Sequence, residues 1–109
     1  PQGLLNARPA RVEPAVARIL TLNPLSTTSG STTITVFEDN HGRSTSDTVR
    51  FRDGESGAGI TAADINNASG FTITVTNANN YTFTASGTAT ATAKIGGGSI
   101  SAGPVTLSP

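Results

Sequence analysis

The segment FTITVTNANNYTFTA, residues 71–85, decides the fold class of this 109-residue chain. Apolar residues alternate with threonine on both sides of the asparagine-rich stretch 77–80, and a period of two is typical of a strand with one buried face. Threonine suits the outer face, because its branched side chain fits the pleat while its hydroxyl stays in water. Asparagine tolerates left-handed backbone and bonds to its own main chain. The segment therefore predicts an antiparallel hairpin whose inward-facing residues are Phe71, Ile73, Val75, Tyr81 and Phe83.

Two earlier segments repeat this alternation. STTITVFE has Ile34 and Val36 on one face, and DTVRFR has Val49 and Phe51 on one face. Turn residues separate these segments, as in compact antiparallel β domains. We expect an all-β protein: a small antiparallel β-sandwich or partly open barrel, with one short helical turn and an extended N-terminal arm.

The helical turn is predicted at TAADIN, residues 61–66. Thr61 suits the N-cap position, and Asp64 stands three residues later, where the acid of a capping box answers the cap.

Composition excludes several classes of function. The chain has 13% charged residues and a formal net charge of +0, so it lacks the broad positive field that holds nucleic acid or an anionic membrane. It has no cysteine, which rules out disulfides, thiolate zinc sites and cysteine nucleophiles. No apolar stretch approaches the ~20 residues of a membrane-spanning helix. No cofactor motif is present.

The N-terminal segment, residues 1–31, contains four prolines and is predicted to be an extended arm. Residues 32–98 are the predicted antiparallel β domain, and residues 99–109 a C-terminal strand or tail. Within the arm, ARILTL alternates as a strand, which we favour, although Val16, Ile19 and Leu20 also fit helical spacing.

The arm is rich in apolar and basic residues, so we expect it to lie on the surface of another protein. An extended chain rises ~3.3 Å per residue, which gives ~25 residues a reach of ~80 Å. The residues expected to bind the partner are Leu4, Leu5, Arg8, Arg11, Val12, Val16, Arg18 and Ile19.

TATATAK, residues 88–94, alternates like a strand but offers only alanine to bury. Alanine admits close approach of another backbone, so we expect a partner chain to cover this face. The following Gly96–Gly98 predicts a flexible or bulged connection, and Ile100 and Val105 predict a short closing strand or a second arm broken at Pro104.

His41 is the only histidine, and with Ser44 and Asp39 or Asp47 it has the residue types of a catalytic triad. The preferred interpretation is a polar turn, because Asp, Asn, His and Gly are selected there by backbone geometry. We therefore expect no catalytic residue.

Two other charged groups have both a functional and an ordinary interpretation. Asp53 and Glu55 lie among glycines and could bind a cation, but their order departs from an EF-hand loop, so a solvated loop is favoured. Arg50 and Arg52, with Arg43, could grip an acidic partner or form a solvated face paired with Glu38 or Asp53.

Between residues 32 and 98 the order of motifs resembles a small β module that recurs in virion proteins of tailed bacteriophages. The motifs are a turn at His41-Gly42, a strand with Asp47, Val49 and Phe51, the segment Gly59-Ile60-Thr61-Ala62, and the run Tyr81 to Thr84. The resemblance implies a structural role in a particle and provides no catalytic residues.

We therefore expect a non-enzymatic structural protein of a tailed-phage virion, assembled in the bacterial host cytoplasm. The preferred role is capsid decoration, with the arm clamping subunits of the major capsid protein or other virion subunits, and with the chain forming a homo-oligomer. The alternatives are a tail, baseplate or fibre module, or a glycan-binding fibre tip with Tyr81 as its stacking platform. No nucleic acid, membrane or cofactor is expected as a partner.

Overall fold

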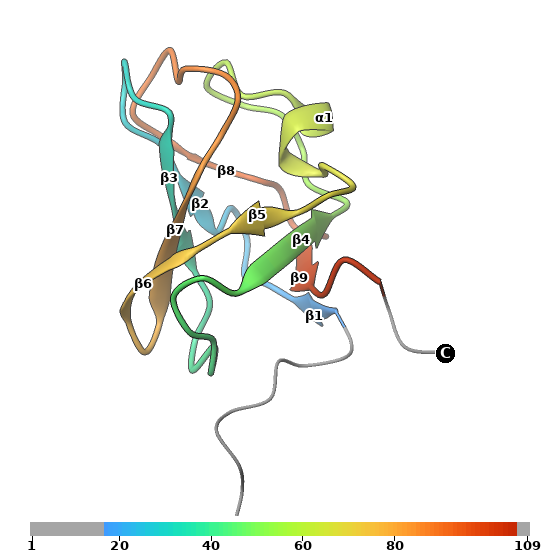
Figure 1. The fold of residues 1–109 in the computed structure, drawn as a ribbon. Coiled ribbons are helices and arrows are strands. Elements are labelled where there is room, and N and C mark those ends of the chain that lie inside the picture. Colours follow the sequence, from blue (N-terminus) through green and yellow to red (C-terminus); the bar gives the residue numbers. More distant parts are fainter. Residues whose placement is uncertain (1–16, 107–109) are drawn as a thin grey trace, which may run out of the picture.

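The computed structural model describes residues 17–106, which form two antiparallel sheets and one helical turn (Figure 1). The elements are β1 (Arg18–Ile19), β2 (Leu25–Ser26), β3 (Thr33–Phe37), β4 (Thr48–Arg52), α1 (Ala62–Ile65), β5 (Phe71–Thr72), β6 (Thr74–Asn77), β7 (Asn80–Thr84), β8 (Lys94–Ile95) and β9 (Ser101–Gly103). One sheet has the order β1-β9-β4-β5 and the other β6-β7-β3-β2-β8. Within these residues the sheets do not close into a barrel, so the predicted all-β class is confirmed as an open sandwich.

The predicted hairpin is present, and its first half divides between the two sheets. β6 pairs with β7 through Val75↔Tyr81 and Asn77↔Asn80, with a register irregularity between Val75 and Asn77. The preceding β5 instead pairs with β4. The chain crosses from one sheet to the other at Ile73, which is buried and whose N–H donates to the Asp47 carbonyl at 3.0 Å. A strand that changes sheets in this way makes a corner of the sandwich.

The inward faces follow the predicted alternation. Residues from both sheets are buried in one core, and Phe83 of β7 contacts Phe51 of β4 and Phe71 of β5, with ring centroids 5.2 Å and 4.2 Å apart. Such aromatic contacts between facing sheets add to the burial of apolar area. The fully buried large side chains are Tyr81, Phe51, Leu25, Ile34, Ile60, Ile65, Ile73, Ile100, Val36 and Val49.

Part of the segment predicted as an arm lies inside the sheets. β1 pairs with β9, and β2 lies between β3 and β8. Leu25 of β2 is fully buried. Removing residues 1–25 would therefore remove β1 and a core side chain, so any truncation that is meant to spare the folded body has to stop before residue 17.

The alanine-rich segment pairs along its edge with another part of the same chain. Of the three alanines on its predicted inner face, Ala89 is buried in the core, Ala93 is half-buried and Ala91 is exposed, so cover by a partner chain stays a prediction. Residues 27–31 run beside residues 89–93, with hydrogen bonds from Thr27 N to Ala93 O and from Gly30 N to Ala89 O, each 2.8 Å long. The Thr27 hydroxyl also donates to the Ala91 carbonyl at 2.8 Å. Alanine does admit close approach of a backbone here, but that backbone is the strand-like segment after β2. Only Lys94 and Ile95 of this region form a strand, β8.

The closing strand β9 lies between β1 and β4, and its small residues let β1 approach closely. A Cβ added at Gly103 would lie 2.7 Å from the Ala17 Cα. The neighbouring Ala102 is fully buried in the core. Figure 1 shows β9 and β1 side by side at the same end of the molecule.

The helical turn α1 begins at the predicted cap. The Thr61 side chain accepts a hydrogen bond from Asp64 N at 3.1 Å, as an N-cap residue does. The Asp64 carboxylate does not act as the acid of a capping box, which would accept from the Thr61 N–H. Its Oδ2 accepts instead from the N–H groups of Ser86 and Gly87, at 2.9 and 3.1 Å. Asp64 thus fastens the loop after β7 to the helix.

Candidate interaction site beside strand β1

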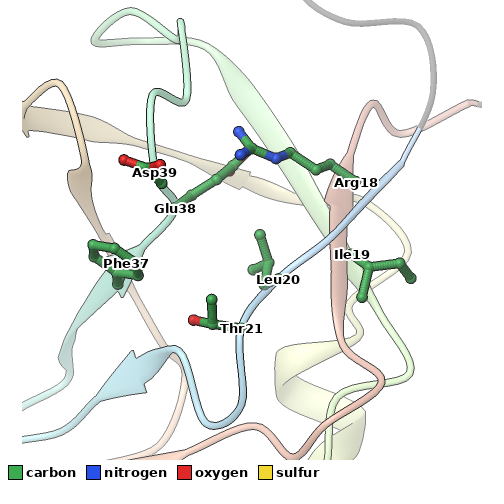
Figure 2. A pocket seen from close by; sticks show the side chains of 7 residues that line it. All are labelled: Arg18, Ile19, Leu20, Thr21, Phe37, Glu38 and Asp39. Atoms are coloured by element: carbon green, nitrogen blue, oxygen red, sulfur yellow. The ribbon is translucent and has the colours of Figure 1, made fainter.

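A small depression lies where β1 passes the end of β3 (Figure 2). Its lining residues are Arg18, Ile19, Leu20, Thr21, Phe37, Glu38 and Asp39, and its volume is about 40 Å³. A cavity needs about 10–15 Å³ of volume, measured in this way, to hold one water molecule. The depression therefore has room for a few waters and is too small for a sugar or a nucleotide, so its significance lies in the side chains around it.

Glu38 is the centre of a buried polar cluster behind this depression. Its carboxylate accepts from Arg43 Nε at 3.0 Å and Nη2 at 3.3 Å, and from the Tyr81 hydroxyl at 2.7 Å. Arg18 reaches the same carboxylate from β1, with Nη1 3.5 Å from Oε2, and Figure 2 shows its side chain extended toward Glu38. Because β1 and β3 belong to different sheets, the Arg18–Glu38 contact ties the sheets together.

Burial sets the electrostatics of the cluster. The Arg43 side chain is 0% exposed and that of Glu38 is 2% exposed, so their attraction is little screened by water. Burial raises the pKa of Tyr81 far above its ordinary value, and the adjacent Glu38 carboxylate raises it further. Burial is the largest single effect on Arg43 and lowers its pKa, but the hydrogen bonds and charge interactions with Glu38 and Tyr81 together outweigh it, so the pKa of Arg43 is raised. The raised pKa values keep Arg43 protonated and Tyr81 a neutral phenol.

His41 is part of this cluster and is not arranged as a catalytic base. Its Nε2 is 2.6 Å from the Asn77 carbonyl, and its Nδ1 accepts from Arg43 N at 2.9 Å. Its ring packs edge-on against Tyr81 with centroids 5.2 Å apart. Ser44 and Asp47 instead bond to each other, Ser44 N donating to Asp47 Oδ2 at 2.9 Å. This geometry agrees with the polar turn and leaves neither ring nitrogen for a serine nucleophile.

Tyr81 cannot serve as a stacking platform for a glycan, because it is 0% exposed. The exposed aromatic ring near the depression is Phe37, which is 40% exposed at the end of β3. The sequence pattern placed Phe37 on the outer face with the threonines, and it does lie there.

The predicted partner-binding residues are only partly within the described structure. Arg18 and Ile19 form β1 and are both exposed, Ile19 to 67%. Their side chains point to opposite sides of the strand in Figure 2, as the predicted alternation requires. The remaining six, Leu4, Leu5, Arg8, Arg11, Val12 and Val16, lie outside the described residues.

The glycine-rich segment with Asp53 and Glu55, which the sequence offered as a possible cation site, pairs with another part of the chain. Glu55 forms an isolated bridge to Gly96, with its N–H donating to the Gly96 carbonyl at 3.0 Å. Within residues 17–106, no group of three or more His, Asp or Glu residues is arranged to hold a metal ion. The same residues include no helix suited to crossing a membrane.

The shape of the chain is similar to part of a phage protein. The comparison with family models gives no match, and neither does the comparison with curated proteins. Among solved structures, an endosialidase of phage phi92 matches with a TM-score of 0.61 and 29% sequence identity. The match covers 81% of this chain and 12% of the endosialidase chain. The chain thus corresponds to about an eighth of that protein's length, and its fold is that of a β module found in a phage protein.

Proposed function

We propose that this chain is a non-enzymatic structural module of a phage particle, which binds neighbouring virion subunits. The observation that carries the proposal is the similarity of 81% of the chain to a short part of the phi92 endosialidase. The matched part is only 12% of the endosialidase chain, so most of the endosialidase, which could contain its enzymatic part, has no counterpart in this match.

The buried polar cluster supports a structural role for the charged side chains. Glu38 bonds to the Arg43 side chain and to the Tyr81 hydroxyl, and His41 bonds to the main chain of Arg43 and Asn77, so these groups stabilise the folded core. A catalytic group would need an atom directed at a substrate within hydrogen-bond reach. In this cluster the donors and acceptors are instead bonded to other protein groups, except Arg43 Nη1, which is buried without a partner among the described residues.

Two locations in the particle follow from this proposal. In the first, the chain decorates the capsid and its N-terminal residues clamp capsid subunits. In the second, it belongs to the tail, baseplate or fibre. The first location rests on the apolar and basic N-terminal segment, and the second on the similarity to part of a phage endosialidase.

Immunogold labelling of purified phage particles that contain the chain tests both points. We expect gold on the particles, and its place on the head or the tail decides between the locations. Absence of the chain from washed particles would overturn the proposal. Oligosialic acid incubated with the purified chain should give no new reducing ends, and a turnover that His41→Ala abolishes would contradict the non-enzymatic role.

Deletion of residues 1–16 tests the arm without removing β1. We expect the shortened chain to keep the circular dichroism spectrum and melting temperature of the full chain while losing its place in the particle. Normal incorporation of a folded shortened chain would show that the arm is not the binding element. Deletion of residues 1–25 is not a useful control, because it also removes the buried Leu25.

A further inference from the structure

The outer face of the four-stranded sheet carries two arginines above a floor of small residues. Val49 and Phe51 of β4 point into the core, so Arg50 and Arg52 point outward. The pairing of β4 with β9 sets Arg50 beside Gly103 and Arg52 beside Ser101. One strand further, Ile19 pairs with Ser101 and completes this face at the edge of the sheet.

Neither arginine is in an ion pair within residues 17–106. The sequence offered two acids as partners, Glu38 and Asp53. Glu38 is paired with Arg43 and Arg18, and Asp53 forms no ion pair with either arginine in the described part of the chain. Arg52 Nη2 donates to the Val105 carbonyl at 2.9 Å. Both arginine side chains are half-buried, and Arg52 Nη1 and Arg50 Nε are buried atoms without an acceptor among these residues. Burial lowers the pKa of Arg52, and the neighbouring Arg50 lowers it further. Two cations therefore stand side by side without a compensating carboxylate, an arrangement that an acidic partner would stabilise.

Exposed apolar groups accompany the arginines. Ile19 is 67% exposed, and Val105, whose carbonyl accepts from Arg52, is 37% exposed. Arginine together with apolar side chains is the composition typical of protein interfaces.

The edge beside Ile19 is also open to another main chain. β1 is the edge strand of its sheet in this part of the chain. Leu20 N donates to the Ile100 carbonyl at 2.9 Å, so the alternation of an antiparallel ladder directs the N–H and C=O of Ile19 away from β9. Such an edge accepts a strand from a second polypeptide.

We propose that this face, defined by the half-buried Arg50 and Arg52 and the exposed Ile19 above the buried Ser101 and Gly103, docks a carboxylate-bearing segment of a neighbouring protein subunit. The arginines bind its carboxylates, and Ile19 contacts its apolar side chains. Ile19 was predicted as part of the arm, but it belongs to β1 of the folded body, so deleting residues 1–16 leaves this surface in place and its binding can be measured separately from incorporation into the particle.

Nuclear magnetic resonance of the 11.0 kDa full chain tests the docking surface. The probe is a ten-residue peptide of alternating Glu and Leu, and the matched peptide has Gln in place of Glu. We expect the acidic peptide to shift the amide signals of β4, β9 and β1, and the Gln peptide to bind about tenfold more weakly, since charge-assisted hydrogen bonds are roughly twice as strong as neutral ones. Shifts confined to other elements, or no shifts, would overturn the proposal.

Single substitutions separate the site from general charge. We expect Arg50→Gln and Arg52→Gln each to weaken binding about tenfold, and Arg52→Lys to weaken it less, because lysine keeps the charge but loses the planar fork. Lys94→Gln, which removes an exposed cation on β8 of the other sheet, is the matched control and should bind like the parent chain. An equal loss in Lys94→Gln would show non-specific attraction, and tighter binding of a sialic-acid trimer than of the peptide would make the surface a glycan site instead.

Discussion

Replacing Glu38 with glutamine should strongly destabilise the fold. Glu38 is buried and bonds to Arg43, whose side chain is 0% exposed, and to Tyr81. Glutamine keeps an acceptor for the Tyr81 hydroxyl but leaves the Arg43 charge uncompensated. Removing one partner of a buried ion pair costs about 3–5 kcal/mol, and the retained acceptor favours the lower end, about 3 kcal/mol. At roughly 4–8 °C per kcal/mol for a domain of this size, we expect the melting temperature to fall by about 12–24 °C.

Two further variants decide whether the buried charge is the cause. Asp39→Asn removes an exposed carboxylate one residue away and should change the free energy of unfolding by less than about 0.5 kcal/mol. Glu38→Gln combined with Arg43→Met removes both charges, so it should recover much of the stability lost by Glu38→Gln alone. Thermal unfolding followed by circular dichroism measures all three. A fall below about 4 °C for Glu38→Gln, or a double variant less stable than the single one, would refute the reasoning.

Three other outcomes are expected. Tyr81 is the only tyrosine, and burial raises its pKa, so the neutral phenol stabilises the fold below pH ~10 and this stability is lost as the pH rises above the pKa of an unfolded tyrosine. Absorbance at 295 nm, which reports ionised tyrosine, should therefore rise only together with loss of the folded circular dichroism signal. Reversible ionisation near pH 10 in a folded chain would contradict this. Gly97→Ala should lower the melting temperature, because Gly97 has a φ of 83° and a Cβ there would meet Glu55 Cδ at 2.6 Å. Gly98→Ala is the control and should be tolerated, because a Cβ at Gly98 would lie 3.5 Å from the nearest side chain. Thr61→Ala should lower the free energy of unfolding by about 1 kcal/mol in chemical denaturation, and no change would mean that the cap is dispensable.

The strand pattern could be predicted because each strand has one wet and one dry face. Alternation located β3, β4 and the β6–β7 hairpin, and the Thr61 cap located α1. Alternation does not say which sheet a strand joins, so the crossing at Ile73 was not foreseen. β2 was missed for a related reason: two residues are too short to show a period, and Pro24 before them suggested an arm.

The buried polar cluster could not be located from local sequence. Glu38 and Arg43 lie in a stretch whose composition is that of a solvated turn, and charged residues are seldom fully buried. One signal was available: Tyr81 falls at an inward position, and a buried tyrosine hydroxyl needs a hydrogen-bond partner. That partner proved to be Glu38, 43 residues away along the chain, which only the pairing of β3 with β7 brings near.

The pairing of β1 with β9 has a consequence for how such a unit is used in longer polypeptides. Arg18 faces Ala102, so the chain enters and leaves the folded body through adjacent strands. A folded unit whose first and last strands are adjacent can be inserted into a surface loop of another protein, because the two loop residues that flank the insertion stay close together. Insertion of this kind would let the unit occur in proteins of different architecture without disturbing either fold.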